Sequence, residues 1–235
     1  MNIDELQTPC LLLDRGRMLC NIARLKNHLG PLNAQFRPHV KTAKCPEIAS
    51  LMLGSSSDPI TVSTLKEAEQ FAAAGYRDIL YAVSIVPSKL PRAMSLRRNG
   101  IDLSIILDTI EVATSVVSAC DKYKGSIPVL IEIDSDGHRA GIRCDDPMLI
   151  EVARVLHDGG AELRGVMTHA GSAYKHPGAK ALCNMAEQER AAVVAAAEQL
   201  RDKGFPCPVV SVGSTPTATF VDSLSGVTEV RAGVF

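Results

Sequence analysis

The strongest constraint on the fold is a regular alternation of short apolar runs with longer segments of helical periodicity. The apolar runs have the length and composition of strands and cover residues 33–38, 60–62, 78–82, 103–107, 127–133, 163–168, 208–212 and 227–231. Helical patterns follow them at residues 46–54, 64–74, 88–99, 109–122, 146–159, 178–203 and 216–224. Eight strands with seven intervening helices predict an α/β chain folded as a (β/α)₈ TIM barrel without its last helix.

Local signals support the helix boundaries. Thr64 and Glu67 have the spacing of a capping box, and Gly75 ends the same helix. Pro147 stands at the start of a later helix and Gly159 at its end. A doubly wound open sheet also alternates strands and helices, but it would call for a glycine-rich turn after the first strand, and none occurs there.

The two ends of the chain complete the prediction of one barrel domain over residues 1–235. An apolar strand is expected at residues 8–14, followed by an amphipathic helix at 17–29 that stops at Gly30. Residues 229–235 have the pattern of the eighth strand and its exit, so we expect the chain to be truncated before the closing helix.

Composition excludes several classes of partner. The formal charge of -1 and the pI near 6.6 leave no electrostatic footprint for nucleic acid or an anionic membrane. No apolar run approaches the roughly 20 residues that span a bilayer, and the acidic start does not resemble a secretion signal. Seven scattered cysteines without a CxxC pair favour reduced thiols and a cytoplasmic location. The ligand is therefore expected to be a small molecule.

A basic cluster follows the first strand, in the sequence Arg37-Pro38-His39-Val40-Lys41-Thr42. A lysine delivered by a barrel strand into a partly dry site can lose its proton, because desolvation disfavours the ammonium form. The neutral amine is then a nucleophile suited to Schiff-base chemistry. The alternative is an ordinary surface lysine near the start of a helix.

A second candidate element follows the seventh strand. Gly213, Ser214 and Thr215 begin a turn into a helix, offering close approach, hydroxyl groups and backbone amides that suit a phosphate. In (β/α)₈ enzymes a phosphate is often held after strands seven and eight. Gly233 and Val234, which follow the eighth strand, are expected to complete this cradle. A plain helix cap is the alternative.

Arginine, histidine and tyrosine follow the fifth and sixth strands. Arg139 is a candidate ligand for an anionic or phenolic oxygen, with a loop salt bridge to Asp136 as the alternative. The acids and the histidine around it could suggest a metal site, but strand alternation would point them in different directions. His169 and Tyr174 are candidates for contact with the ligand, and a buried structural histidine is the alternative for the first of them.

Taken in order, these motifs resemble the fold type III pyridoxal-phosphate enzymes, whose barrel is of the alanine racemase N-terminal type. The resemblance is to the branch of D-serine dehydratases, D-threonine aldolases and, most closely, the D-threo-3-hydroxyaspartate dehydratases. It implies that Lys41 carries pyridoxal 5'-phosphate as a Schiff base and acts as the base at Cα. It also implies roles for Arg139, His169 and Tyr174 beside the cofactor, and for the loops at 213–215 and 233–234 on its phosphate. Ala43 departs from the family pattern, which has histidine there.

The resemblance implies a lyase that removes the β-hydroxyl group of a 3-hydroxy D-amino acid, giving a 2-oxo acid and ammonia. Cleavage of D-threonine to glycine and an aldehyde is one alternative, and a barrel that binds the cofactor without turnover is another. Members of this branch use a divalent metal (zinc, manganese or magnesium) held by a C-terminal β domain. The ligands of that metal have no counterpart in this sequence. A homodimer is expected for the full-length protein.

Overall fold

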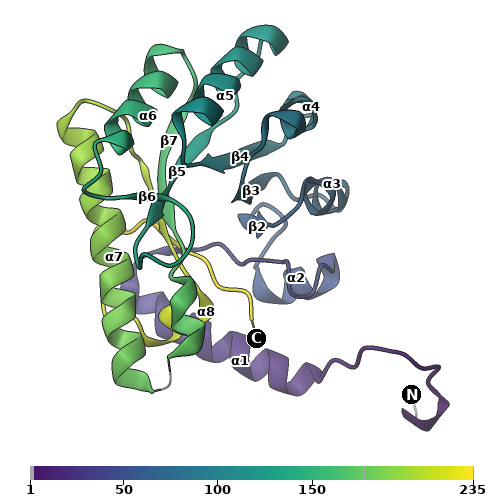
Figure 1. Cartoon of the computed structure of the whole chain (residues 1–235). Helices are drawn as coiled ribbons and strands as arrows, with labels where there is room; N and C mark the ends of the chain where they lie inside the picture. Colours follow the sequence, from purple (N-terminus) through teal and green to yellow (C-terminus); the bar gives the residue numbers. More distant parts are fainter. Residues whose placement is uncertain (1–2, 177, 235) are drawn as a thin grey trace.

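The computed structural model describes residues 3–176 and 178–234, and its strands form one curled parallel sheet surrounded by helices (Figure 1). The strands are β1 (Gln35–Phe36), β2 (Ile60–Val62), β3 (Asp78–Ser84), β4 (Asp102–Leu107), β5 (Val129–Asp134), β6 (Ile142–Arg143), β7 (Leu163–Thr168), β8 (Val209–Val212) and β9 (Glu229–Val230). Their order is β1-β9-β8-β7-β5-β4-β3-β2, with β6 paired to β5. The eight predicted strands are therefore confirmed, and the two-residue strand β6 was not predicted.

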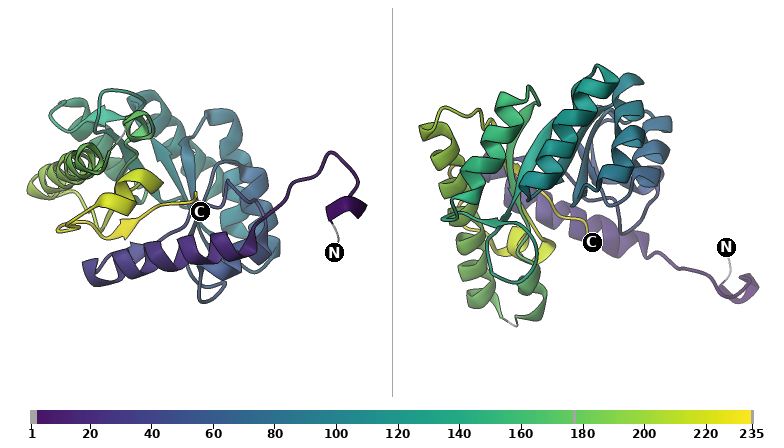
Figure 2. Two further views of the ribbon diagram at one scale, coloured as in Figure 1. Left: turned by 90° about the horizontal axis from the view of Figure 1, so that it is seen from below. Right: turned by 45° about the horizontal axis from the view of Figure 1, so that its top comes forward.

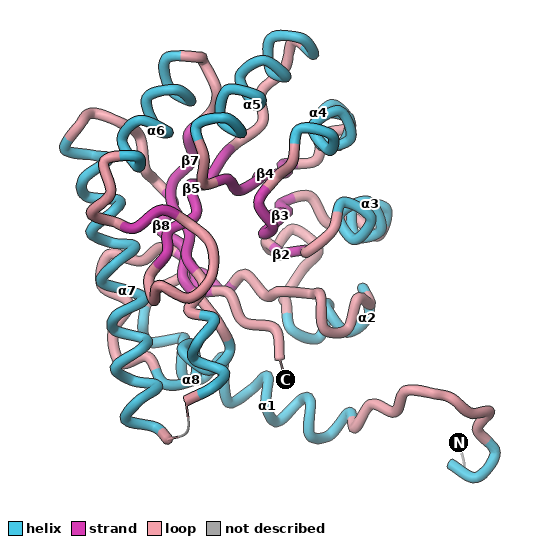
Figure 3. The backbone as a smooth tube through the Cα atoms, in the orientation of Figure 1, coloured by secondary structure: helices cyan, strands magenta, loops and turns pink. Residues whose placement is uncertain are grey.

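The helices lie outside the strands, as Figure 3 shows by colour. They are α1 (Arg15–Leu29), α2 (Pro46–Met52), α3 (Leu65–Ala73), α4 (Leu90–Arg98), α5 (Ile110–Tyr123), α6 (Met148–Asp158), α7 (Ala179–Asp202) and α8 (Thr215–Phe220). The predicted capping residue Thr64 caps α3, since its side chain accepts a hydrogen bond from the Glu67 amide at 3.0 Å. Each α-helix expected from the sequence is present within a few residues of its predicted bounds.

The ring of strands closes between its two terminal strands. Beyond β1, the Val40 amide donates to the Thr61 carbonyl at 2.9 Å, and the Thr61 amide donates to the Pro38 carbonyl at 2.8 Å. The same segment pairs with the other neighbour, since the His39 amide donates to the Ala232 carbonyl at 2.9 Å. Residues 37–40 continue β1 and pair with β2 on one side and with the segment after β9 on the other, so the barrel is closed and Lys41 lies at its rim.

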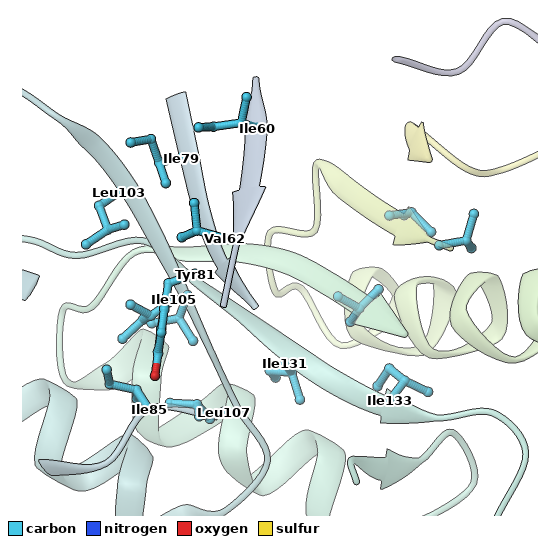
Figure 4. Close-up of a cluster of buried hydrophobic side chains, with 14 of the residues drawn as sticks. Ile60, Val62, Ile79, Tyr81, Ile85, Leu103, Ile105, Leu107, Ile131 and Ile133 are labelled. Carbon is cyan, nitrogen blue, oxygen red and sulfur yellow. The ribbon is translucent and has the colours of Figure 1, made fainter. Parts of the chain in front are cut away.

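Apolar side chains form two clusters, one on the outer and one on the inner side of the barrel strands. The larger one fills the space between the strands and the helices, and Figure 4 shows part of it, including Ile79, Ile105 and Ile131. The smaller one lies inside the barrel and consists of Leu80, Ile106, Leu130 and Met167, with Ala82 and Val209 packed against it. This alternation of neighbouring residues between the two clusters is the period-two pattern of strands.

Charged side chains occupy the rest of the barrel interior. Arg37 Nε donates to Glu229 Oε2 at 2.7 Å, and Ser211 Oγ donates to Glu229 Oε1 at 2.6 Å. Arg37 also pairs with Asp78 at 2.7 Å. Buried charges persist when partners satisfy them, and removal of one partner leaves the other uncompensated. Both Arg37 and Glu229 are buried, so this network fixes β1, β3, β8 and β9 relative to one another.

The predicted strand at residues 8–14 is wrong. Residues 10–14 have no strand assignment, and the side chains of Leu11, Leu12 and Leu13 are exposed. A strand needs a neighbouring strand for its backbone hydrogen bonds, and this segment runs away from the barrel in all the views of Figures 1 and 2. The helix that follows is confirmed, with Ile22, Leu25 and Leu29 buried. Within residues 3–176 and 178–234, no helix combines the length and the apolar composition of a membrane-spanning segment.

Candidate active site

One pocket at the carboxyl ends of the strands brings the predicted site residues together. It opens to solvent, and the space not filled by protein atoms, including part of that opening, is about 520 Å³. Its lining consists of His39, Lys41, Ala82, Glu132, Arg139, Met167, His169, Tyr174, Gly213, Ser214, Thr215, Arg231, Ala232, Gly233 and Val234. All nine residues predicted from the sequence are among them. Their proximity is thus established, whereas their roles remain predictions.

Lys41 lies on a short turn at the rim, solvent-exposed on one side and facing the pocket on the other. Lys44, at the end of this turn, has a left-handed φ of 52° and pairs with Glu67 at 3.3 Å. Partial burial lowers the pKa of Lys41, with further lowering from Arg139 and Arg231 and an opposing effect from Glu67. This shift makes the neutral, nucleophilic amine more accessible near neutral pH.

His39 anchors the turn in its neutral form. Its Nδ1 accepts a hydrogen bond from the Lys41 amide at 3.4 Å, so the proton is on Nε2, which lies 3.3 Å from Ser63 Oγ. Burial, together with the charges of Lys41 and Arg231, lowers the pKa of His39 to about 3. The imidazole therefore supports the lysine turn without adding another positive charge.

His169 has the opposite tautomer. Its Nδ1 lies 2.7 Å from the Gly213 carbonyl oxygen, and a carbonyl can only accept, so Nδ1 carries the proton. Burial lowers the pKa of His169 to about 4, and the positive charges of Arg231, Arg139 and Lys41 lower it further, against the opposing effect of the hydrogen bond to Gly213. Its Nε2 therefore carries a lone pair. The ring of Tyr174 lies beside it, with the centroids 6.2 Å apart.

Arg139 does not form the loop salt bridge considered as its alternative. Asp136 instead accepts hydrogen bonds from the Ser172 amide at 3.0 Å and from Ser172 Oγ at 2.6 Å. Within residues 3–176 and 178–234, the Arg139 guanidinium has no hydrogen bond or ion pair. It is an exposed, pocket-lining cation and is therefore available to an anionic ligand.

Two glycines let the loops after β8 and β9 approach other backbone segments. Gly213 has a φ of 141°, and a Cβ there would lie 2.0 Å from the Arg231 carbonyl oxygen. A Cβ on Gly233 would lie 2.2 Å from the His39 carbonyl oxygen. Any side chain at either position would displace a neighbouring strand end, so close approach explains the glycines.

The hydrogen bonds in these loops refine the predicted phosphate cradle. The Gly233 and Val234 amides both donate to Thr215 Oγ1, at 3.2 and 3.0 Å. Two donors thus converge on one oxygen, as they would on an oxygen of an anion. The Ser214 amide, in contrast, donates to Thr217 Oγ1 at 3.2 Å in a capping box. That amide therefore belongs to a plain helix cap, which is the alternative to a phosphate-binding role for this turn.

Arg231, Glu132 and His39 line the pocket without having been predicted as site residues. Arg231 is buried, with hydrogen bonds to Ser211 Oγ and the Thr168 carbonyl oxygen. Burial raises the pKa of Glu132, whose Oε2 accepts from Ser84 Oγ at 2.9 Å. The alternation of side chains along a strand could have predicted Arg231 and Glu132, because both stand between apolar residues that face outward and therefore face the inside of the barrel.

The charge of this lining favours an anion. Lys41, Arg139 and Arg231 are cations, Glu132 is the one acidic residue in the described lining, and both histidines are held neutral. A surplus of positive charge in a partly enclosed pocket concentrates anionic ligands there. A molecule with a phosphate or carboxylate group fits this environment best.

Comparison with known proteins identifies relatives of the chain. It is 52% identical over 231 residues to D-threo-3-hydroxyaspartate dehydratase from Delftia sp. strain HT23, whose solved structure superposes with a TM-score of 0.95. It is 30% identical to a D-threonine aldolase from Arthrobacter and 29% identical to the D-serine dehydratase of Dictyostelium discoideum. These matches cover 98%, 98% and 99% of this chain.

The chain spans about three-fifths of the length of these curated relatives, at 61%, 61% and 63% of their sequences. The family described as the alanine racemase N-terminal domain matches residues 13–235, which includes every strand of the barrel and all of the pocket lining. This chain therefore belongs to the alanine racemase N-terminal domain family.

Proposed function

We propose that the chain is the pyridoxal-phosphate-binding barrel of a lyase that acts on 3-hydroxy D-amino acids. The proposed substrates are D-threo-3-hydroxyaspartate or D-serine, and the products are a 2-oxo acid and ammonia. The observation that carries the proposal is one pocket containing Lys41, Arg139 and the two glycine loops at 213 and 233. The family and the dehydratase relative imply pyridoxal phosphate as the cofactor.

The residues present fit this cofactor. Lys41 would hold it covalently through Nζ, because the pocket lowers the pKa of its amine. Thr215, Gly233 and Val234 would hold its phosphate: the Gly233 and Val234 amides converge on the Thr215 hydroxyl oxygen, and a phosphate oxygen would replace that oxygen as their acceptor. Gly213 admits the close backbone approach that shapes this end of the pocket. Arg139 and Tyr174 would contact the phenolic oxygen or the substrate carboxylate from the opposite loops.

When bound, pyridoxal phosphate withdraws electrons from Cα of an attached amino acid and so makes the Cα proton acidic. Lys41 would accept that proton at Nζ, as the lowered pKa keeps part of the amine unprotonated. His169 presents an unprotonated Nε2 in the same pocket, suited to accept a hydrogen bond from cofactor or substrate. The Cα proton and the β-hydroxyl group would leave together as water, and hydrolysis of the resulting enamine would give the 2-oxo acid and ammonia.

Departure of hydroxide needs a Lewis acid or a proton donor. We include in the proposal that this step depends on a divalent cation (zinc, manganese or magnesium). The described residues contain no group of three or more His, Cys, Asp or Glu side chains placed to hold such an ion. The proposal also includes a cytoplasmic location and a homodimeric assembly. Size-exclusion chromatography with light scattering tests the assembly.

The test is incubation of the purified, cofactor-loaded protein with D-threo-3-hydroxyaspartate, D-serine and D-threonine, each with and without divalent metal. The matched L-amino acids and a Lys41→Ala variant serve as controls. A 2-oxo acid with ammonia from a D-substrate supports the dehydratase. Glycine with an aldehyde from D-threonine instead indicates an aldolase, and cofactor binding without either product indicates a binding protein without turnover.

A further inference from the structure

The long helix α7 carries a charged residue in the middle of its buried face. Ala186, Val193, Ala196, Ala197 and Leu200 follow helical spacing and pack on the barrel, and Glu189 occupies a place in the same stripe. Its side chain is only 2% exposed. A carboxylate at an apolar position is costly unless its oxygens are hydrogen-bonded, so its contacts indicate what it does there.

Glu189 contacts two loops of the candidate active site at once. Its Oε1 accepts a hydrogen bond from the Ala170 amide at 2.8 Å and from the Gly213 amide at 3.3 Å. Ala170 follows the pocket histidine His169, and Gly213 begins the glycine loop after β8. Burial raises the pKa of Glu189, and the Ala170 and Gly213 amides, the Thr217 hydroxyl and the positive charge of Arg231 act in the opposite direction.

A third hydrogen bond makes this arrangement a closed ring. His169 Nδ1 donates to the Gly213 carbonyl at 2.7 Å, so the peptide groups on both sides of Gly213 are held, one by Glu189 and the other by the imidazole. The neighbouring Gln188 donates to the Ser135 carbonyl at 2.8 Å and ties the same helical turn to the loop after β5. One turn of α7 thus contacts three loops of the pocket.

We propose that Glu189 is a positioning residue, which sets the tautomer and direction of His169 and the shape of the 213–215 loop through one shared carboxylate oxygen. The proposal rests on the proposed function only for what the pocket binds. Removing the oxygen would free both amides, release the Gly213 peptide and let the imidazole swing toward solvent. Both contacts depend on the oxygen as an acceptor, which a glutamine in place of Glu189 would also supply.

The experiment measures the pKa of the His169 imidazole by NMR in cofactor-free protein, in Glu189→Ala and Glu189→Gln variants. Lys41, Arg139 and Arg231 are the charged groups that bear on this imidazole in every variant. Wild type should titrate near 4. We expect the alanine variant to titrate at least about one unit higher, toward the ordinary histidine value, and the glutamine variant to stay near wild type. Glu187→Ala, on the exposed face beside Arg190, is the matched control and should change nothing.

The sign of the shift separates positioning from a simple charge effect. Loss of a negative charge alone would lower the pKa of a nearby histidine in both variants. A fall or no change in Glu189→Ala, or a rise in Glu189→Gln equal to that in Glu189→Ala, would therefore overturn the proposal. If the alanine variant does not fold, Glu189→Asp replaces it, because the shorter side chain withdraws the oxygen while keeping the charge.

Cofactor affinity provides a second, separate readout. Pyridoxal phosphate should bind the alanine variant about tenfold or more weakly, because the 213–215 loop loses the hydrogen bond to Glu189 that holds it in place, and one charge-assisted hydrogen bond is of this size. It should bind the glutamine variant nearly as well as wild type. Failure of wild type to bind pyridoxal phosphate would reject the proposed function. The imidazole titration would still test the role of Glu189.

Discussion

Gly213 and the backbone of Arg231 are so close that a Cβ on the glycine would lie 2.0 Å from the Arg231 carbonyl oxygen. The glycine also has a φ of 141°, which L-residues rarely adopt. We expect Gly213→Ala to destabilise the protein by roughly 2 kcal/mol or more, because strain and overlap act together. The same change should weaken pyridoxal phosphate binding. Chemical denaturation and a cofactor titration measure the two effects.

Gly204→Ala is the matched control for this prediction. Gly204 also has a positive φ, 82°, but a Cβ there would meet no atom within 4 Å. Its replacement should cost only the conformational strain, on the order of 1 kcal/mol, and leave cofactor binding intact. Equal losses in the two variants would mean that backbone conformation, and not the contact with Arg231, explains the glycine.

Lys41 gives a second prediction, on cofactor attachment. Lys41→Ala should abolish the visible absorbance that borohydride reduction removes, because no other lysine lines the described pocket. Lys44→Ala is the control, since Lys44 lies on the same turn but pairs with Glu67 outside the pocket. It should keep the absorbance. A Lys41→Ala protein that retained a borohydride-sensitive band would contradict the assignment of the attachment site.

Much of this barrel could be predicted because its strands and helices differ in period and length. Thr64 and Gly75 marked the ends of a helix that has these ends in the structure, since caps act locally. The segment at residues 8–14 was predicted wrongly because the prediction used local pattern alone. Its apolar residues have strand character, but a strand is defined by a partner, and local sequence does not report whether one is present.

The residues of the candidate site could be predicted where they directly follow a strand. Lys41, Arg139 and Gly213 follow strand ends, and parallel strands bring their carboxyl ends to one side of a barrel. Glu189 could not be found this way. It lies in the middle of a helix, and its importance comes from two amides that are 19 and 24 residues away. Such a role depends on tertiary packing.

The buried pair of Arg37 and Glu229 gives a third prediction, on stability. Their side chains are joined at 2.7 Å and both are nearly inaccessible to water. Glu229→Gln should cost about 3 kcal/mol or more, because Arg37 and the nearby Arg231 then lose a neutralising charge in the interior. Glu151→Gln, at an exposed pair with Arg154, should change the free energy of unfolding by less than about 1 kcal/mol.

A double-mutant cycle separates the pair from its surroundings. Changing Arg37 and Glu229 together to methionine removes both charges and leaves neither uncompensated, so the double variant should be more stable than the sum of the two single changes implies. Strictly additive losses would show that each charge is stabilised mainly by other partners, such as Asp78 for the arginine.

The two pocket histidines predict how stability depends on pH. In the folded protein the pKa of His39 is about 3 and that of His169 is about 4, whereas an unfolded histidine titrates near 6.5. The unfolded chain therefore binds protons first as the pH falls, and acid favours unfolding. Their contribution is fully present above pH 6.5 and is lost progressively toward pH 4 and 3. Between pH 6.5 and 5, each histidine should lower the free energy of unfolding by on the order of 1–2 kcal/mol.

Denaturation curves for wild type, His39→Gln and His169→Gln at pH 7 and 5 measure this dependence, and each variant should lose less stability on acidification than wild type. The His169→Gln variant also retains a side chain able to donate to the Gly213 carbonyl, so its reduced pH dependence would reflect the missing titration and not a lost loop contact. Parallel losses in all three proteins would show that other groups control acid unfolding.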